Sequence, residues 1–203
     1  MSLAIGRTLA RTRRFGLKIR RNEDGATAVE FAIVALPFFL LLFGVMSVCH
    51  LFFWIFTSEN AVWTASRDMR TGAFQTVASG GTVTGSPYNG KTGDALKTEF
   101  RNQICLKTVN PVDCNNNSIV LVQSTAGFST IADPNCKTNT NALVSNTDAM
   151  AAFDAGSSSS TVLVTLCYAW GFGGKLPFFK IGTLSNGAFL IQASAAFRTE
   201  PYN

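Results

Sequence analysis

One apolar stretch near the N-terminus dominates the pattern of hydrophobic and polar positions along the chain. Residues 31–56 carry no charged side chain, and seven of them are phenylalanine. As a helix these residues would be about 39 Å long, against about 30 Å for the hydrocarbon core of a bilayer. The run is apolar on all sides, so a membrane span is a better interpretation than a buried core helix. We expect the helix to continue to about Arg70 and to stop at Gly72.

Shorter patterns in the rest of the chain predict one more helix and three strands. Leu96, Phe100 and Ile104 recur at helical spacing, which predicts an amphipathic helix over 94–106. Runs of β-branched or alternating apolar residues predict the strands. These strands are 118–124, 161–170 and 188–198.

Two polar stretches separate these elements. Residues 78–91 are rich in Gly, Thr and Ser and are typical of a linker. Residues 125–160 predict a loop with at most one short helix near 147–153. The expected fold class is therefore α+β, in which a long N-terminal transmembrane helix precedes a small domain with an antiparallel sheet.

The basic charge of the chain is concentrated before the apolar run. Residues 1–25 hold seven basic and two acidic residues and so account for the whole net charge of +5. Because basic residues stay on the cytoplasmic side of a span, we expect a cytoplasmic N-terminus and an exported C-terminal domain. A cleaved secretory signal is disfavoured, since the run is too long and no small-residue cleavage site follows it. A nucleic-acid partner is not expected, because the folded part carries no basic excess.

The cysteines predict two disulfide bonds in the exported part. Four of the five lie there, Cys105, Cys114, Cys136 and Cys167, and the fifth lies in the apolar run. An even number in an oxidising compartment favours disulfides. Three pairings are open, and the short Cys105–Cys114 loop is the easiest to close, which leaves Cys136 with Cys167. No metal site is expected, because these spacings are not those of metal ligands and the single histidine, His50, lies in the apolar run.

Two patterns that could indicate an enzyme are weak. Residues 85–92 match the P-loop sequence, but the residues before them, 82–84, are too few and too polar for the buried strand that a P-loop follows. The exported acidic residues are dispersed, and the closest pairing, Asp148 with Asp154, lies in the polar loop. We therefore expect no enzymatic activity and no cofactor.

The start of the apolar run resembles known pilus proteins. Gly25-Ala-Thr-Ala-Val-Glu30-Phe resembles the prepilin-peptidase signature of type IV prepilins. Extended through Pro37, the segment resembles the opening of the TadE-like family of tight-adherence (Tad/Flp) pilus assembly proteins. Similarity to the family returns in its second helical block and in its closing motif, at 59–62, 67–72 and 195–202. The family usually carries an acidic residue late in the span, and residues 45–50 have none.

The resemblance implies processing and assembly roles at the head of the helix. A prepilin peptidase would cleave between Gly25 and Ala26, and the new α-amine of Ala26 would pair with a Glu30 carboxylate of the same or a neighbouring chain. Assembly contacts are then expected at Glu30, Phe31 and Pro37. The implied partners are lipid of the inner membrane, other pilin-like subunits and the tight-adherence assembly machinery.

The expected function is that of a non-enzymatic pilin-like subunit or assembly factor that contributes to pilus biogenesis and surface attachment. The expected organisation is a basic cytoplasmic leader over 1–25, a transmembrane and extended helix over 26–72, and a disulfide-linked periplasmic domain over 73–203. Phe178 and Phe179 lie in an aromatic loop that either contacts a partner, folds back as core or touches the bilayer. The alternative is a single-pass membrane protein with a ligand-binding periplasmic domain, neither processed nor assembled. A membrane-anchored hydrolase is the third possibility.

The expected topology is tested with reporter fusions after Asn203. A reporter that is active only in the periplasm should be active there, because the basic leader holds the N-terminus in the cytoplasm. Enzyme activity of the fusion in intact cells measures this. An active cytoplasmic reporter together with a silent periplasmic one would show that the orientation is wrong.

Overall fold

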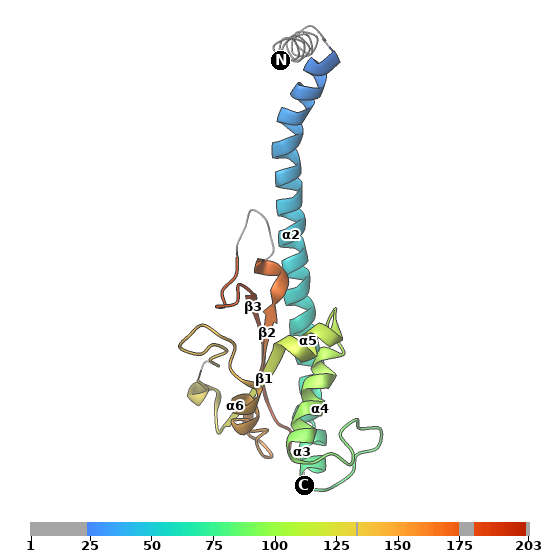
Figure 1. Ribbon diagram of the computed structural model, residues 1–203. Coiled ribbons are helices and arrows are strands. Elements are labelled where there is room, and N and C mark those ends of the chain that lie inside the picture. Colours follow the sequence, from blue (N-terminus) through green and yellow to red (C-terminus); the bar gives the residue numbers. More distant parts are fainter. Residues whose placement is uncertain (1–23, 133, 175–180, 202–203) are drawn as a thin grey trace, which may run out of the picture. The chain divides into compact units, whose positions relative to one another are not determined.

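The computed structural model describes residues 24–132, 134–174 and 181–201 (Figure 1). A long helix, α2 (Asp24–Arg70), precedes several short helices and one three-stranded sheet. The chain divides into two compact units, and the division falls between Leu51 and Phe52, so α2 contributes residues to both. The expected fold class is confirmed: a long apolar helix followed by a small α+β domain with an antiparallel sheet.

The part of α2 that lies in the first unit is uncovered. From Gly25 to Leu51 every side chain is exposed or partly exposed, and none is buried. A surface of Leu, Val, Ile and Phe that faces outward on all sides is unfavourable in water. This half of α2 is long and apolar enough to cross a membrane, as the sequence predicts.

The part of α2 that lies in the second unit has one buried face. Its buried residues recur every three or four positions, which is the spacing of one side of a helix. They are Trp54, Ser58, Ala61, Val62, Ala65, Ser66 and Met69. The helix ends where the sequence predicts, because Gly72 adopts a left-handed conformation with φ of 80° that suits glycine.

The sheet has the order β1-β2-β3 with antiparallel neighbours. The strands are β1 (Ser118–Thr125), β2 (Thr161–Trp170) and β3 (Phe189–Arg198). Each coincides with a predicted strand to within one residue at either end. In the register, Ser118 pairs with Tyr168 on one side of β2, and Thr161 pairs with Arg198 on the other.

All ten residues of β2 are buried, because the strand is central and both faces of the sheet are covered there. On one face the ring of Tyr168 stacks on Trp54 of α2, with 5.4 Å between ring centroids. On the other face Cys167 packs with Ile119 of β1 and with Ala149 of α6 (Asn146–Ala151). The order through the domain is therefore α2, sheet, then α6 and its flanking loop.

The strand β3 has a buried and an exposed face. Ile191, Ala193, Ala195 and Phe197 are buried and alternate with exposed residues. Because Ile191 pairs with Tyr168, the buried side chains of β3 lie on the face of the sheet that α2 covers. The alternation predicted for this strand thus identifies its core side correctly.

An aromatic cluster joins the helices at the end of α2. Phe74 of α3 (Ala73–Ala78) lies 5.5 to 5.7 Å, between ring centroids, from Tyr88, Phe100 and Phe153. Phe100 belongs to α4 (Gly93–Cys105), which confirms the amphipathic helix predicted over 94–106. Residues 79–92 contain no helix or strand, but fully buried Tyr88 fixes this segment to the core.

Four short elements were not predicted. They are α3, α5 (Pro111–Asn117), η1 (Phe128–Thr130) and η2 (Gly171–Gly174). A sequence signal for α5 was present, because Asn110 caps the helix by accepting the Asp113 N–H at 3.2 Å and proline follows at the first helical position. The single short helix expected near 147–153 is α6.

The segment after β3 returns to the end of α2. The backbone N–H of Glu200 donates to the carbonyl of Arg70 at 2.8 Å, and its carboxylate lies 3.6 Å from the Arg70 guanidinium. The N–H of Thr199 donates to the carbonyl of Ser160 at 2.9 Å. A carbonyl at the open end of α2 is thereby satisfied by a residue distant in sequence.

Tyr88 links the aromatic cluster to α2. Its hydroxyl donates to the Asp68 carboxylate at 3.0 Å, and its side chain is fully buried. Burial, and secondly the negative charge of Asp68, raises the pKa of Tyr88 well above its usual range. The folded protein therefore holds the tyrosine proton at a pH at which an unfolded chain releases it.

We expect Tyr88→Phe to lower the free energy of unfolding by about 1.5–3 kcal/mol near pH 8, because a hydrogen bond to a charged acceptor is lost. In the parent the unfolded state loses the Tyr88 proton above about pH 10, so the stability that this group contributes falls as pH rises. The variant has no Tyr88 hydroxyl to titrate and does not lose stability in this way. The difference in unfolding free energy between the two proteins should therefore narrow by about pH 11. Guanidinium unfolding of the full chain in detergent, in a Cys49→Ser background that prevents thiol–disulfide exchange, measures both gaps. A gap that widens with pH would contradict the raised pKa.

Candidate functional site

The predicted processing and assembly residues lie together at the head of α2. Gly25 and Ala26 are in its first turn, and Glu30 and Phe31 follow within about 9 Å along the axis. All four are exposed, and Phe31 is 70% exposed. The sequence reasoning therefore named residues that are accessible to another protein, and their roles in cleavage and assembly stay predictions.

Pro37 lies inside α2 and leaves one backbone carbonyl without its helical hydrogen bond. Proline has no N–H, so the carbonyl of Ile33, four residues earlier, lacks its helical donor. A carbonyl in that position in lipid needs a donor, which a neighbouring helix can supply. Glu30 and Pro37 are seven residues apart, close to two helical turns, so they share one side of α2.

A shallow apolar depression lies on another side of α2, because Ala28 and Ala32 are about 160° around the helix from Glu30. It is lined by Ala28, Val29, Ala32, Ile33 and Leu36. Two alanines four residues apart lower the helix surface, so the backbone of another helix can approach closely there. The depression was not predicted from the sequence, although the spacing of Ala28 and Ala32 was a signal for it.

The late part of the span, where the family usually carries an acid, holds neutral polar groups in this chain. The hydroxyl of Ser47 donates to the carbonyl of Phe43 at 2.7 Å, so it is satisfied within its own helix. Cys49 is exposed and free. These groups make this stretch compatible with lipid without a charged partner.

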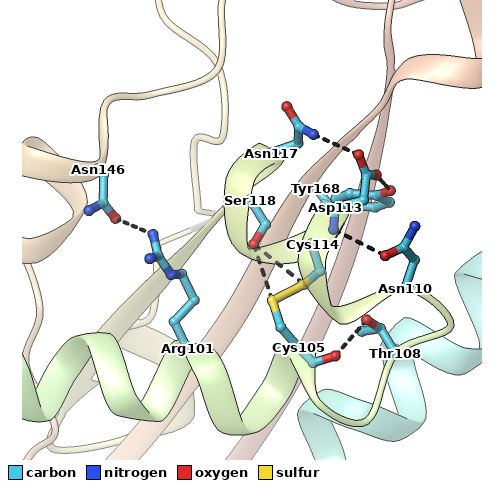
Figure 2. The surroundings of a disulfide bond; sticks show 10 residues. All are labelled: Arg101, Cys105, Thr108, Asn110, Asp113, Cys114, Asn117, Ser118, Asn146 and Tyr168. Carbon is cyan, nitrogen blue, oxygen red and sulfur yellow. Dashed lines mark hydrogen bonds between the residues drawn. A yellow bond between two sulfur atoms is a disulfide. The ribbon is translucent and has the colours of Figure 1, made fainter.

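In the folded domain, the cysteines pair as the sequence analysis proposes. Cys105 bonds Cys114, and Cys136 bonds Cys167, with Cα–Cα distances of 5.5 and 5.7 Å. Figure 2 shows that the first bond joins the end of α4 to α5, with the Ser118 hydroxyl 3.6 Å from both sulfur atoms. The second bond joins β2 to the loop after η1. One bond therefore fixes α5 to α4, and the other fixes this loop to the sheet.

Asp113 of α5 is the acidic group closest to this disulfide in Figure 2, and structural contacts account for it. Its carboxylate accepts hydrogen bonds from the Tyr168 hydroxyl and from the Asn117 amide, the latter at 2.8 Å. Burial, and secondly the bond to Asp113, raises the pKa of Tyr168 well above its usual range. The arrangement fixes α5 against β2.

The segment that matches the P-loop sequence has a structural role. The Lys91 ammonium lies 2.9 Å from the Glu99 carboxylate of α4 and holds the pKa of that carboxyl below its usual value. No strand precedes the segment in the described residues 24–84. The lysine that would contact phosphates in a P-loop is thus engaged by a carboxylate, which supports the rejection of a nucleotide site.

The dispersed acidic residues make local structural contacts, and a cavity beside α2 is small. Asp148 interacts with the Ser145 hydroxyl that caps α6, at 2.6 Å, and Asp154 accepts the Gly156 N–H at 2.9 Å in a turn. Within the described part of the chain, no group of three or more His, Cys, Asp or Glu residues is placed to hold a metal ion. A cavity between α2 and β3 measures about 140 Å³, which is below the usual size of a small-molecule site. It is lined by Trp63, Ser66, Arg67, Arg70 and Phe197.

Two sequence predictions lie outside the described residues. These are the basic leader, apart from its last two residues, and the aromatic loop with Phe178 and Phe179. The leader's orienting role and the loop's partner role stay predictions.

Comparison with known families bears on the head of α2. Residues 25–67 match the family model described as TadE-like protein. The match begins at the predicted processing glycine and ends in the last turn of α2, so it covers the helix and none of the sheet. The resemblance to the TadE-like family is confirmed over these residues. No curated protein and no solved structure is significantly similar to the chain.

The two disulfides should differ in their contribution to stability. The Cys105–Cys114 bond closes a loop with a sequence separation of 9, and the Cys136–Cys167 bond one of 31. Chain entropy alone gives about 2.6 kcal/mol for the first and about 3.7 kcal/mol for the second. We expect Cys136→Ala/Cys167→Ala to lose more unfolding free energy than Cys105→Ala/Cys114→Ala. Guanidinium unfolding of both double variants measures the difference, and the reverse order would contradict the entropic account.

Proposed function

We propose that this chain is a non-enzymatic pilin-like subunit or assembly factor of a tight-adherence pilus, anchored in the inner membrane by α2. The observation that carries the proposal is the TadE-like match over residues 25–67, which starts at the glycine where processing would occur. The family match suggests a pilus-associated protein and other pilus assembly components as its partners.

In this proposal the basic leader stays in the cytoplasm and the folded domain lies in the periplasm. The charge placement supports this orientation. Two disulfide bonds in the folded domain also support it, because such bonds persist in oxidising compartments.

Assembly in this proposal uses the uncovered half of α2. A prepilin peptidase cleaves after Gly25, and the cationic α-amine of Ala26 pairs with a Glu30 carboxylate of a neighbouring subunit. The depression at Ala28 and Ala32 accepts a neighbouring helix, which also brings a donor to the carbonyl of Ile33. After cleavage the chain has ten basic and ten acidic residues, so association depends on packing and local pairs more than on long-range attraction.

The proposal is tested by the N-terminus of the protein in filaments. We expect the chain in pili sheared from cells or in the assembly complex in the membrane. In either place it should begin at Ala26. Gly25→Leu should leave the leader attached, because the larger side chain blocks the processing site. Mass spectrometry of the intact protein measures both. A wild-type protein that keeps residues 1–25 would overturn the proposed processing.

The pairing role of Glu30 gives a second prediction. A carboxylate in lipid without a partner costs a few kcal/mol, so Glu30→Ala and Glu30→Gln should lose the interaction with a neighbour's α-amine. We expect both variants to be exported and folded but to co-purify less with other pilus subunits and to support less surface attachment. Glu59→Gln is the matched control, because Glu59 is the other charged residue between 26 and 66. Normal assembly of both Glu30 variants would mean that this carboxylate is only solvated at the interface.

A further inference from the structure

One end of the folded domain carries exposed apolar side chains that its core does not use. Leu106 and Val109, in the turn between α4 and α5, are 59% and 44% exposed, and Val112, in the first turn of α5, is 71% exposed. Phe172 of η2 is 46% exposed. A single exposed apolar residue is ordinary, but a group of them marks an interaction surface.

Contacts inside the domain place the turn between α4 and α5 at the level of Trp54. Trp54 of α2 stacks on Tyr168 of β2. The Tyr168 hydroxyl donates to Asp113, the residue that follows Val112. Two direct contacts therefore connect the first turn of α5, which directly follows the turn between α4 and α5, to one position along α2.

The same end of the domain includes η2. Trp170, two residues beyond the stacked tyrosine, lies 5.4 Å from Phe172 between ring centroids. Figure 1 shows η2 and the turn between α4 and α5 at the same end of the sheet. Exposed side chains of α2 belong to this end as well, because Phe52, Phe53 and Phe56 lie within two residues of Trp54, and they are 64%, 53% and 69% exposed.

The position of Trp54 along α2 determines how deep this end of the domain lies relative to the bilayer. Trp54 lies two residues before the end of the uncharged run 31–56. With Phe31 as the first residue in the hydrocarbon core, Trp54 lies about 35 Å further along the helix axis. That is about 5 Å beyond the core, in a headgroup region. Side chains at the level of Trp54 then lie where acyl chains and headgroups meet.

We propose that Leu106, Val109, Val112 and Phe172 form a membrane-contact patch, which rests on the bilayer where α2 leaves it. The inference rests on the membrane anchor of the proposed function and extends it to the folded domain. The occupant is lipid, because lipid surrounds the apolar run of α2 whether or not other subunits are present. Burial of this apolar surface in lipid stabilises the contact.

The charges near the patch suit a lipid surface. Lys107, between two patch residues, is exposed, so its stem can lie along the patch while its ammonium reaches lipid phosphates. The neighbouring carboxylate, Asp113, accepts hydrogen bonds from Tyr168 and Asn117. The patch therefore restricts the tilt of the domain on the bilayer through apolar contact and one cation.

The test measures lipid contact of a fluorescent label in the full chain. Val112→Cys is made in a Cys49→Ser background, labelled with an NBD fluorophore without reduction of the disulfides, and reconstituted in phosphatidylethanolamine–phosphatidylglycerol vesicles at less than one chain per vesicle. Lipids with a spin label near the headgroup should remove at least about half of the emission. Because both leaflets have the same composition, the orientation of insertion does not affect the result.

Two labelled control positions separate the inference from the proposed anchor. Ala95→Cys lies at the other end of α4, about 15 Å from Cys105, and should keep its emission. Phe43→Cys lies in the apolar run and should be quenched by a spin label deep in the acyl region. Quenching at position 43 with none at 112 would overturn the patch and leave the anchor standing. No quenching at position 43 would overturn the anchor itself. A label at 112 that is shielded only at high protein density would overturn lipid as the occupant and indicate a second copy.

Discussion

The packing of one side of α2 on the sheet is the interaction on which the rest of the domain depends. Ala61 and Ala65 are buried in the middle of this side and Trp54 and Met69 at its two ends, and Trp54 stacks on Tyr168 of β2. The sheet needs an apolar helix face on which to bury its own side chains. The helix in turn needs the sheet to remove this face from water. A single helix is thus divided between an outward apolar surface in one unit and an inward apolar stripe in the other.

The main elements of the fold could be predicted because each has a strong local period. The spacing of Leu96, Phe100 and Ile104 identifies α4, and the alternation along β3 identifies both the strand and its buried face. The alternation in β2 gave the strand but could not show that its second face is also buried, since that depends on α6 and the Cys136 loop. The helices α3 and α5 have no more than two turns each, and their stability comes from Phe74 in a distant aromatic cluster and from the Cys114 disulfide.

The candidate site divides in a similar way. Gly25, Glu30 and Pro37 could be named because they stand at the positions of a known family motif, and their roles stay predictions. The contact between Trp54 and Tyr168 joins residues that are more than a hundred positions apart, and nothing local to either residue indicates it. The apolar residues of the α4–α5 turn also gave no signal, because Leu and Val in a loop are ambiguous until their exposure is known.

The hydrogen bond from Glu200 to the carbonyl of Arg70 has a consequence for the order in which the domain forms. The last strand and the segment that closes α2 are synthesised after every other described element, and the buried side chains of β3 lie on the face of the sheet that α2 covers. The second unit therefore completes its core only after residue 200 has been synthesised and, in the proposed orientation, exported. Until then α2 is held by its apolar half alone, and the uncovered stripe from Trp54 to Met69 is open to chaperones or to other subunits. In the proposed orientation, export of this chain precedes completion of its core, and the interval between the two is when the core is most exposed to misassembly.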